Sequence, residues 1–202
     1  MHVFEDYCRM EKKILYVGQE THYWENMGEH LSVEFLRNKY ARFDLGKCAD
    51  YKDGKPHRYL RSPFWNFSRS FFQLMNRHTD GVIRKTNGFL WTNLSKFDYH
   101  GQTPPVDLQQ RNEAGFALLK DELAILQPDI VVFLTGHKYD FWIERLFGPA
   151  REPLLGDYLY LLRDQSHELP QLAFQTHHPH TLNRGRMYYA VLDRMAQQLT
   201  TE

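Results

Sequence analysis

Lys13-Ile14-Leu15-Tyr16-Val17-Gly18-Gln19-Glu20-Thr21-His22-Tyr23-Trp24 is the stretch around which the rest of the chain is organised. It opens with a short apolar run, residues 14–17, typical of a buried strand in a parallel sheet, although a buried helix segment shows the same pattern. Gly18 ends the run, and Glu20 follows at once. Ligands of open α/β sheets bind just beyond the carboxyl ends of the strands, so Glu20 stands where a site is expected. Taken alone, the motif favours a plainer interpretation, a turn in which Glu20 is solvated or caps a helix that begins near Met27.

Three later segments also read as strands that end in polar side chains. The strands are predicted at residues 89–93, 130–134 and 172–175, and they close with Asn93, Thr135-Gly136-His137 and Thr176-His177-His178. Helical patterns are predicted at residues 27–40, from Ser62-Pro63, from Asp107 to Pro128, at residues 139–147 and from about Arg186. Residues 158–162 are predicted as a small edge strand, and the polar residues 41–61 as a loop. This alternation predicts an α/β fold, a three-layer α/β/α sandwich around a four-stranded, mostly parallel sheet, in a single domain over residues 1–202.

The polar residues at the strand ends are expected to meet in one crevice, because the carboxyl ends of parallel strands lie at the same edge of a sheet. That edge would hold the Glu20 carboxylate, the Asn93 amide and a histidine imidazole. A carboxylate can stabilise a developing cation, and an imidazole can hydrogen-bond a leaving group that gains negative charge. An amide suits the edge of a nucleobase. The set fits hydrolysis of an N-glycosidic bond, and it also fits other hydrolytic reactions.

The bulk composition limits the class of protein. The 202 residues, 42% of them hydrophobic, suffice for a globular domain with its own core. The 25 basic and 25 acidic residues cancel, so nonspecific polyanion binding is not expected, although a local basic face would suffice for nucleic acid. No apolar run could span a bilayer, and the first residues show no secretory pattern, so we expect a cytoplasmic protein without membrane contact. Cys8 and Cys48 are expected to be reduced thiols.

The motifs predict neither a metal nor a cofactor. No glycine-rich dinucleotide fingerprint, phosphate-binding loop or nucleophilic serine elbow follows a strand. The run His177-His178-Pro179-His180 could supply zinc ligands, but it has no cysteine or acidic ligand nearby. The plainer interpretation of these histidines is a polar surface loop.

At these motifs the chain resembles the uracil-DNA glycosylase superfamily. Gly18-Gln19-Glu20 resembles the first motif of that family, Gly-Gln-Asp followed by Pro-Tyr-His. Residues 178–182, which read His-Pro-His-Thr-Leu, resemble its last motif, His-Pro-Ser-Pro-Leu. Residues 89–93 match a strand that ends in a base-reading asparagine, and residues 128–136 fit the third strand of the family. The resemblance covers nearly the whole chain in the right order.

The resemblance implies a role for each residue of the crevice. Glu20 takes the place of the aspartate that activates water and stabilises the sugar cation. Gln19 contributes backbone contacts to the base, Asn93 reads the pyrimidine edge, and His178 stabilises the departing base anion.

The resemblance also implies DNA as the partner, either a duplex with one flipped nucleotide or a single strand, and we expect the protein to bind it as a monomer. Leu182 would be the wedge that enters the duplex and holds the flipped nucleotide out. Asn183, Arg184 and Arg186 would hold phosphates near the last helix. A solvated helix start explains the two arginines equally well.

Two departures from the family pattern bear on the substrate. Glu20 is one methylene longer than aspartate, and Thr21-His22 replaces Pro-Tyr, whose tyrosine excludes pyrimidines with a bulky group at ring position five. With His22 in its place, the pocket could admit a modified pyrimidine. The aromatic ring expected to stack on the base is Phe64, with Trp24 and Trp65 as alternatives.

The Gly-Gln-Glu-Thr motif followed by a tryptophan also resembles a branch of the superfamily found in bacteria and their mobile elements. One member type is a phage-defence glycosylase that removes glucosylated hydroxymethylcytosine from viral DNA. The long polar segment 41–61 would suit such a large base.

Three functions are compatible with the sequence. The first is a monofunctional DNA glycosylase that leaves an abasic site; no lysine stands in the motifs as a Schiff-base nucleophile, so strand cleavage is not expected. The second is a non-catalytic reader of flipped or modified bases, which would not need Glu20. The third is a hydrolase of free nucleosides or nucleotides, which would need neither Leu182 nor the two arginines.

Overall fold

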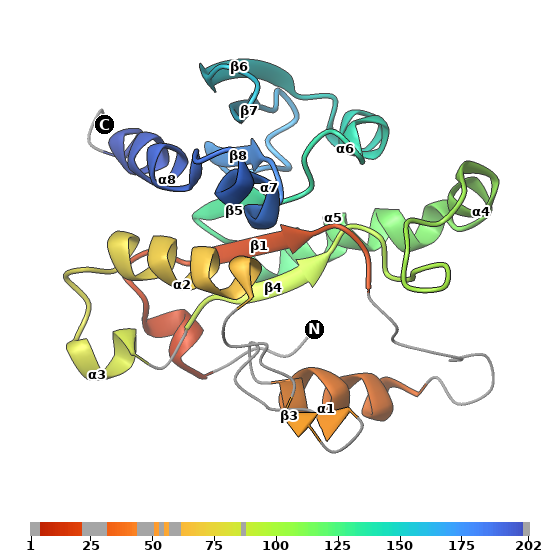
Figure 1. Ribbon diagram of the computed structural model, residues 1–202, viewed down its shortest axis with the longest axis horizontal. Helices are drawn as coiled ribbons and strands as arrows, with labels where there is room; N and C mark the ends of the chain where they lie inside the picture. Colours follow the sequence, from red (N-terminus) through yellow and green to blue (C-terminus); the bar gives the residue numbers. More distant parts are fainter. Residues whose placement is uncertain are drawn as a thin grey trace.

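The computed structural model describes residues 5–21, 32–43, 51–52, 55–56, 62–85 and 88–199. A six-stranded sheet with the strand order β4-β1-β5-β8-β7-β6 forms its centre (Figure 1). Its strands are β1 (Ile14–Gly18), β4 (Leu90–Asn93), β5 (Ile130–Phe133), β6 (Ala150–Leu155), β7 (Leu159–Arg163) and β8 (Leu172–Thr176). A separate antiparallel pair consists of β2 (Tyr51–Lys52) and β3 (Lys55–Pro56).

The predicted α/β class is confirmed, but the prediction of a four-stranded sheet is wrong. Strands β4, β1, β5 and β8 pair in parallel, and the antiparallel strands β7 and β6 extend the sheet beyond β8. The strand predicted at residues 158–162 exists as β7, but it is not an edge strand because β6 pairs with its outer side. The sequence of β6, Ala-Arg-Glu-Pro-Leu-Leu, lacks apolar alternation and contains Pro153, which sheets tolerate mainly at their edges.

The helices lie in the connections between these strands and at the two ends of the chain. They are η1, a 3₁₀ helix (Glu5–Arg9), and the α-helices α1 (Val33–Phe43), α2 (Pro63–Met75), α3 (Gly81–Arg84), α4 (Val106–Arg111), α5 (Glu113–Leu126), α6 (Asp140–Phe147), α7 (Pro179–Arg184) and α8 (Tyr188–Gln197). Ser62 caps α2 as its sequence predicts, because its Oγ accepts the backbone N–H of Trp65 at 3.3 Å. The single helix predicted from Asp107 is two helices, α4 and α5, that meet at Asn112.

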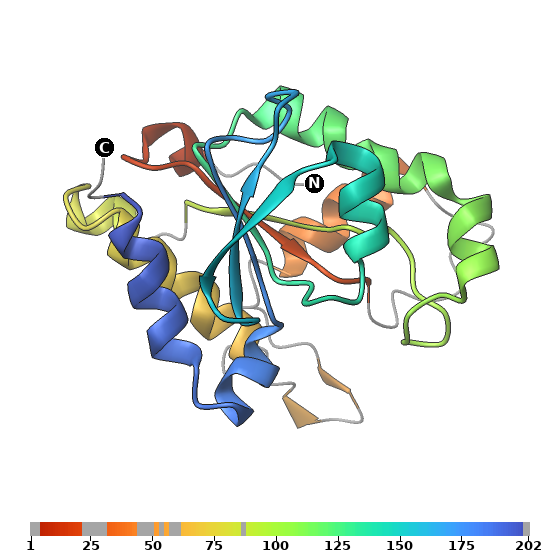
Figure 2. The same ribbon diagram turned by 90° about the horizontal axis from the view of Figure 1, so that it is seen from above.

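Two hydrophobic cores lie on the two faces of the sheet. Successive side chains of a strand point to opposite faces, so Ile14 and Tyr16 pack with α2 and α8, whereas Leu15 and Val17 pack with α5 and α6. Figures 1 and 2 show α2 and α8 on one side of the sheet and α5 on the other. The parallel strands are therefore buried on both faces, which explains their unbroken apolar runs.

Part of the predicted early region lies outside the described residues, including the helix start near Met27 and most of the segment 41–61. Within the described part of the chain, no helix is both long enough and apolar enough to cross a bilayer.

Candidate active site

Asn93 lies directly beside Gly18, because β1 and β4 pair in parallel with these two residues in register. A Cβ added at Gly18 would collide with Oδ1 of Asn93, so only glycine leaves room for the amide at this position. The Asn93 side chain is buried, and no group among the described residues hydrogen-bonds its amide. A buried amide normally has a partner, so this one is available to a ligand.

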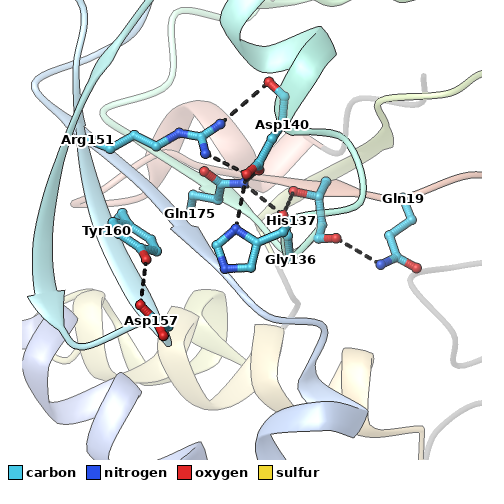
Figure 3. A network of polar contacts seen from close by, with 9 residues as sticks. Gln19, Gly136, His137, Asp140, Arg151, Asp157, Tyr160 and Gln175 are labelled. Carbon is cyan, nitrogen blue, oxygen red and sulfur yellow. Dashed lines mark hydrogen bonds and ion pairs between the residues drawn. The ribbon is translucent and has the colours of Figure 1, made fainter.

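Gln19 joins the ends of the neighbouring strands. Its side-chain Nε2 donates to the backbone carbonyl of Thr135 at 2.9 Å, at the end of β5 (Figure 3). Its own carbonyl accepts the backbone N–H of Ser95 at 2.9 Å, just past β4. The side chain and the carbonyl are thus engaged within the protein.

The Glu20 carboxylate is held by three donors, Thr103, Lys138 and Tyr139, and we call these four residues the Glu20 cluster. Oε1 accepts from Lys138 Nζ at 2.8 Å and from Thr103 Oγ1 at 3.4 Å, and Oε2 accepts from the Tyr139 hydroxyl at 2.7 Å. The Glu20 side chain is 11% exposed, so it is nearly enclosed yet still accessible to solvent. A carboxylate has about four lone-pair sites, so these bonds leave room for a water.

Tyr139 acts as a fixed neutral donor in the Glu20 cluster. Burial raises the pKa of its hydroxyl, and the adjacent Glu20 charge raises the pKa further. The hydroxyl therefore keeps its proton at any physiological pH and holds the carboxylate in one orientation.

The sequence did not reveal Lys138, Tyr139 or Thr103 as parts of the site. Lys138 and Tyr139 directly follow the polar residues that end the β5 strand. The sequence would have predicted them as site residues if two further positions after that strand had been included. Gly136 makes that turn possible with a φ of +58°. Thr103 comes from the loop before α4 and gives no such signal.

His178 lies at the start of α7 and is held as a neutral imidazole. Burial lowers the pKa of His178 to about 4, and the nearby His180 contributes to the lowering. The Glu20 charge opposes this effect, and Lys138 adds to it. Because the backbone N–H of His180 donates to Nδ1 at 3.2 Å, the ring proton resides on Nε2. His178 therefore presents one N–H donor at neutral pH.

Phe64 is the predicted aromatic that lies beside His178. Their rings are nearly parallel, with an interplanar angle of 25° and centroids 6.1 Å apart. Trp65 is 4% exposed and packs in the core, so it is not placed to stack on a ligand. Trp24 and His22, the other predicted pocket residues, lie outside the described residues.

Glu20, Asn93 and His178 lie at the same edge of the sheet. Gly18 and Asn93 are in register, and β5 alone separates β1 from β8. Neighbouring strands are about 4.8 Å apart, so the backbones that carry Glu20 and His178 are roughly 10 Å apart. The effect of the Glu20 charge on the pKa of His178 agrees with this proximity.

The structure contradicts the predicted wedge at Leu182. Its side chain is fully buried in the core formed with α2 and α8, so it cannot enter a duplex. The reason is α7, a helix that the sequence analysis did not predict. It places Pro179 and Leu182, three residues apart, on its buried face, while Asn183 and Arg184 are exposed. Arg186, just beyond the helix, is also exposed.

A second carboxylate cluster, which we call the Asp140 network, lies beside the first and consists of His137, Asp140, Arg151 and Gln175 (Figure 3). Arg151 Nη1 and Gln175 Nε2 each reach Asp140 at 2.6 Å, and Nδ1 of His137 lies 3.0 Å from it. Burial alone would raise the pKa of Asp140, but hydrogen bonds from Arg151, Gln175 and His137 outweigh it, and the pKa is lowered.

No metal site emerges from the described residues, and a hollow elsewhere in the fold lies away from the Glu20 cluster. Within the described part of the chain, no group of three or more His, Cys, Asp or Glu side chains could hold a metal ion. One hollow of about 660 Å³ lies between the end of α5 and residues 167–170. It opens near the amino end of β5, the sheet edge opposite the one at which such folds bind ligands.

No known protein family matches the sequence, and no curated protein matches it. The resemblance to the uracil-DNA glycosylase superfamily therefore rests on the motif residues of the sequence alone.

Proposed function

We propose that the protein is a monofunctional DNA glycosylase that hydrolyses the N-glycosidic bond of a flipped pyrimidine. The observation that carries the proposal is the arrangement at one sheet edge. A carboxylate fixed by three donors, a buried amide without a described partner and a neutral imidazole lie together there. A reader of bases would need the amide and an aromatic ring, but it would not need the anchored carboxylate.

Each residue takes one part in the proposed reaction. Asn93 hydrogen-bonds the edge of the pyrimidine and Phe64 contacts its face. As the bond between C1′ and the base nitrogen breaks, the electron pair leaves with the base, and Nε2–H of His178 donates to the developing anion. The Glu20 charge stabilises the cationic sugar and positions the water that attacks C1′. The proton lost by that water passes to Glu20 or to solvent, and an abasic site remains.

A ring with a pKa of about 4 is a hydrogen-bond donor at neutral pH and not a general acid, so the base leaves as an anion. A base that leaves as a stable anion, such as uracil, suits this chemistry. Uracil is one candidate. A modified cytosine with a bulky substituent at ring position five, such as the glucosylated hydroxymethylcytosine of phage DNA, is the other, because His22 stands where the family has a blocking tyrosine.

A panel of oligonucleotides tests the proposal. Single-stranded and duplex DNA carrying uracil, hydroxymethylcytosine or glucosylated hydroxymethylcytosine is incubated with the protein, and abasic sites are then cleaved by hot alkali. We expect strand breaks at one of these bases only after alkali treatment. No breaks with any substrate would refute the proposal, and release of bases from free nucleosides at a comparable rate would favour a nucleoside hydrolase.

A further inference from the structure

A polar groove lies where α2, α7 and α8 meet, and His178 is the residue directly before α7. It has a volume of about 380 Å³ and is lined by Asn66, Arg69 and Gln73 of α2, Asn183 of α7, and Tyr188 and Tyr189 of α8. The three α2 residues share one face of the helix because they are three and four positions apart. No lining residue carries a negative charge. The groove is therefore lined by amides, one guanidinium and two phenol rings, of which Asn66 and Arg69 also interact within the protein.

The two tyrosines give the groove a firm aromatic wall. Tyr188 is anchored, because its hydroxyl lies 3.4 Å from Ser70 Oγ and its ring packs edge-to-face on Phe67 at 5.3 Å. Tyr189 lies against Tyr188, with ring centroids 5.1 Å apart, yet it is 76% exposed. One ring thus supports the other, and the outer ring has an open face.

We propose that this groove binds an unpaired segment of a DNA strand, with a base stacked on Tyr189 and the backbone held by Arg69 and the amides. Proteins that bind single strands combine these parts, an aromatic stacking platform and a cationic track for the phosphates. Bases inside a duplex are already stacked on each other, so an exposed ring of this kind can stack only on an unpaired base. A protein partner is disfavoured because the groove lacks the apolar centre typical of protein interfaces.

The position of the groove relative to His178 supports a continuous strand path, and this part of the inference rests on the proposed function. His178 caps α7, and Asn183 lies five residues further along the chain. At about 1.5 Å of rise per residue, the backbone of Asn183 lies roughly 7.5 Å along α7 from the backbone of His178. The groove would hold the nucleotides next to the one that is excised.

Fluorescence anisotropy with an unmodified labelled oligonucleotide, single-stranded or in a duplex, tests the inference without requiring any reaction. We expect Tyr189→Ala and Tyr189→Leu to weaken single-strand binding about fivefold or more, and Tyr189→Trp to preserve it, because stacking needs a π face. Arg69→Ala should make the slope of log affinity against log salt concentration less steep, by about the contribution of one phosphate contact. Arg111→Ala is the matched control for charge: this exposed arginine lies on α4, at the opposite end of the molecule from α8 (Figures 1 and 2).

Each result has a defined meaning. Unchanged binding by the Tyr189 variants, or an equal loss with Arg111→Ala, would overturn the inference. An equal loss on duplex and single-stranded DNA would overturn the assignment to an unpaired strand. If the variants weaken binding as expected but no base is excised from any oligonucleotide, the groove stands and the glycosylase proposal fails. If bases are excised and the Tyr189 variants bind normally, the glycosylase proposal stands and the groove assignment fails.

Discussion

The Glu20 cluster and the Asp140 network share one turn of the chain after β5, yet they differ in what their carboxylates face. Lys138 and Tyr139 turn toward Glu20, whereas His137 and Asp140 turn toward the strands β6 and β8. Both clusters contain a carboxylate and a cation within 2.8 Å. An ion pair by itself therefore does not distinguish a candidate catalytic carboxylate from a structural one.

The difference lies in what surrounds each carboxylate. Asp140 is surrounded by donors from the sheet, including Arg151 of β6 and Gln175 of β8, so it ties the antiparallel end of the sheet to the parallel part. Glu20 lies two residues beyond Gly18, which pairs with Asn93, and the Asn93 amide has no partner among the described residues. We therefore expect changes in the Glu20 cluster to affect the reaction, and changes in the Asp140 network to affect stability.

The largest effect is expected for Glu20→Gln. The amide keeps the shape of the side chain and can still bond Tyr139, but it cannot stabilise a cationic sugar. We expect the single-turnover rate of base release to fall about a thousandfold, or roughly 4 kcal/mol in the barrier. Thermal unfolding should change little. A normal rate in this variant would show that Glu20 takes no part in the reaction. The two clusters would then not differ in the roles assigned to them.

His178 should show the next largest effect, in stability as a function of pH. Its folded-state pKa of about 4 lies below its ordinary value near 6.5, so the unfolded chain binds a proton in this window and the folded protein does not. Stability should therefore fall as the pH drops from about 6.5 to about 4, by roughly 3 kcal/mol in total.

The variant His178→Asn serves as the control, because it can still cap α7 but does not titrate. Denaturant unfolding across this pH range should be flatter for the variant than for the unchanged protein. The variant should also release the base about a hundredfold more slowly. Parallel pH curves for the two proteins would contradict the buried, neutral imidazole.

Asp140→Asn should affect stability more than the reaction. The change leaves Arg151 partly buried without its full partner, and we expect a loss of about 2 kcal/mol in the free energy of unfolding. The pKa of Asp140 is lowered in the folded state, so its contribution is present above about pH 4 and is lost as the pH falls through the folded pKa. The difference from the unchanged protein should therefore shrink in acid. A rate loss as large as that of Glu20→Gln, with normal stability, would reverse the roles assigned to the two clusters.

Tyr139→Phe should have a smaller effect. It removes the donor to Oε2 of Glu20 and leaves Lys138 on Oε1, so the carboxylate keeps its charge and loses part of its orientation. We expect a rate reduction of about tenfold, equivalent to roughly 1.4 kcal/mol, with a normal affinity for DNA. A change in affinity without a change in rate would show that the hydroxyl serves binding instead.

Borohydride, which reduces and traps a Schiff base between a lysine and DNA, is expected to trap no intermediate. The structure places Lys138 against Glu20, but an ammonium that is paired with a carboxylate has no free electron pair with which to attack C1′. We expect no covalent protein–DNA adduct by gel electrophoresis. A trapped adduct that disappears in Lys138→Met would show a strand-cleaving activity and would end the monofunctional assignment.

The parallel core of the sheet and its polar edge could be predicted from sequence because their signals are local. Each buried strand is a short apolar run. The residues that follow it lie at the edge of the sheet where the parallel strands end, because all of these strands point the same way. Strand β6 was not predicted from the sequence because it is half-exposed and has no apolar pattern. Leu182 was misjudged for a related reason. Its motif resembles a wedge loop, but the helix α7 turns the side chain inward, and the helix forms through packing on α2 and α8.

The sequence by itself determined the α/β class, the four parallel strands and the positions of Glu20, Asn93 and His178 at the strand ends. These follow from periodicity and from the common direction of parallel strands. Only the tertiary structure decided which groups hold the Glu20 carboxylate and which way Leu182 points. These depend on contacts between residues that are distant in the chain, such as Glu20 with Thr103 and Tyr139, and no local pattern encodes such contacts.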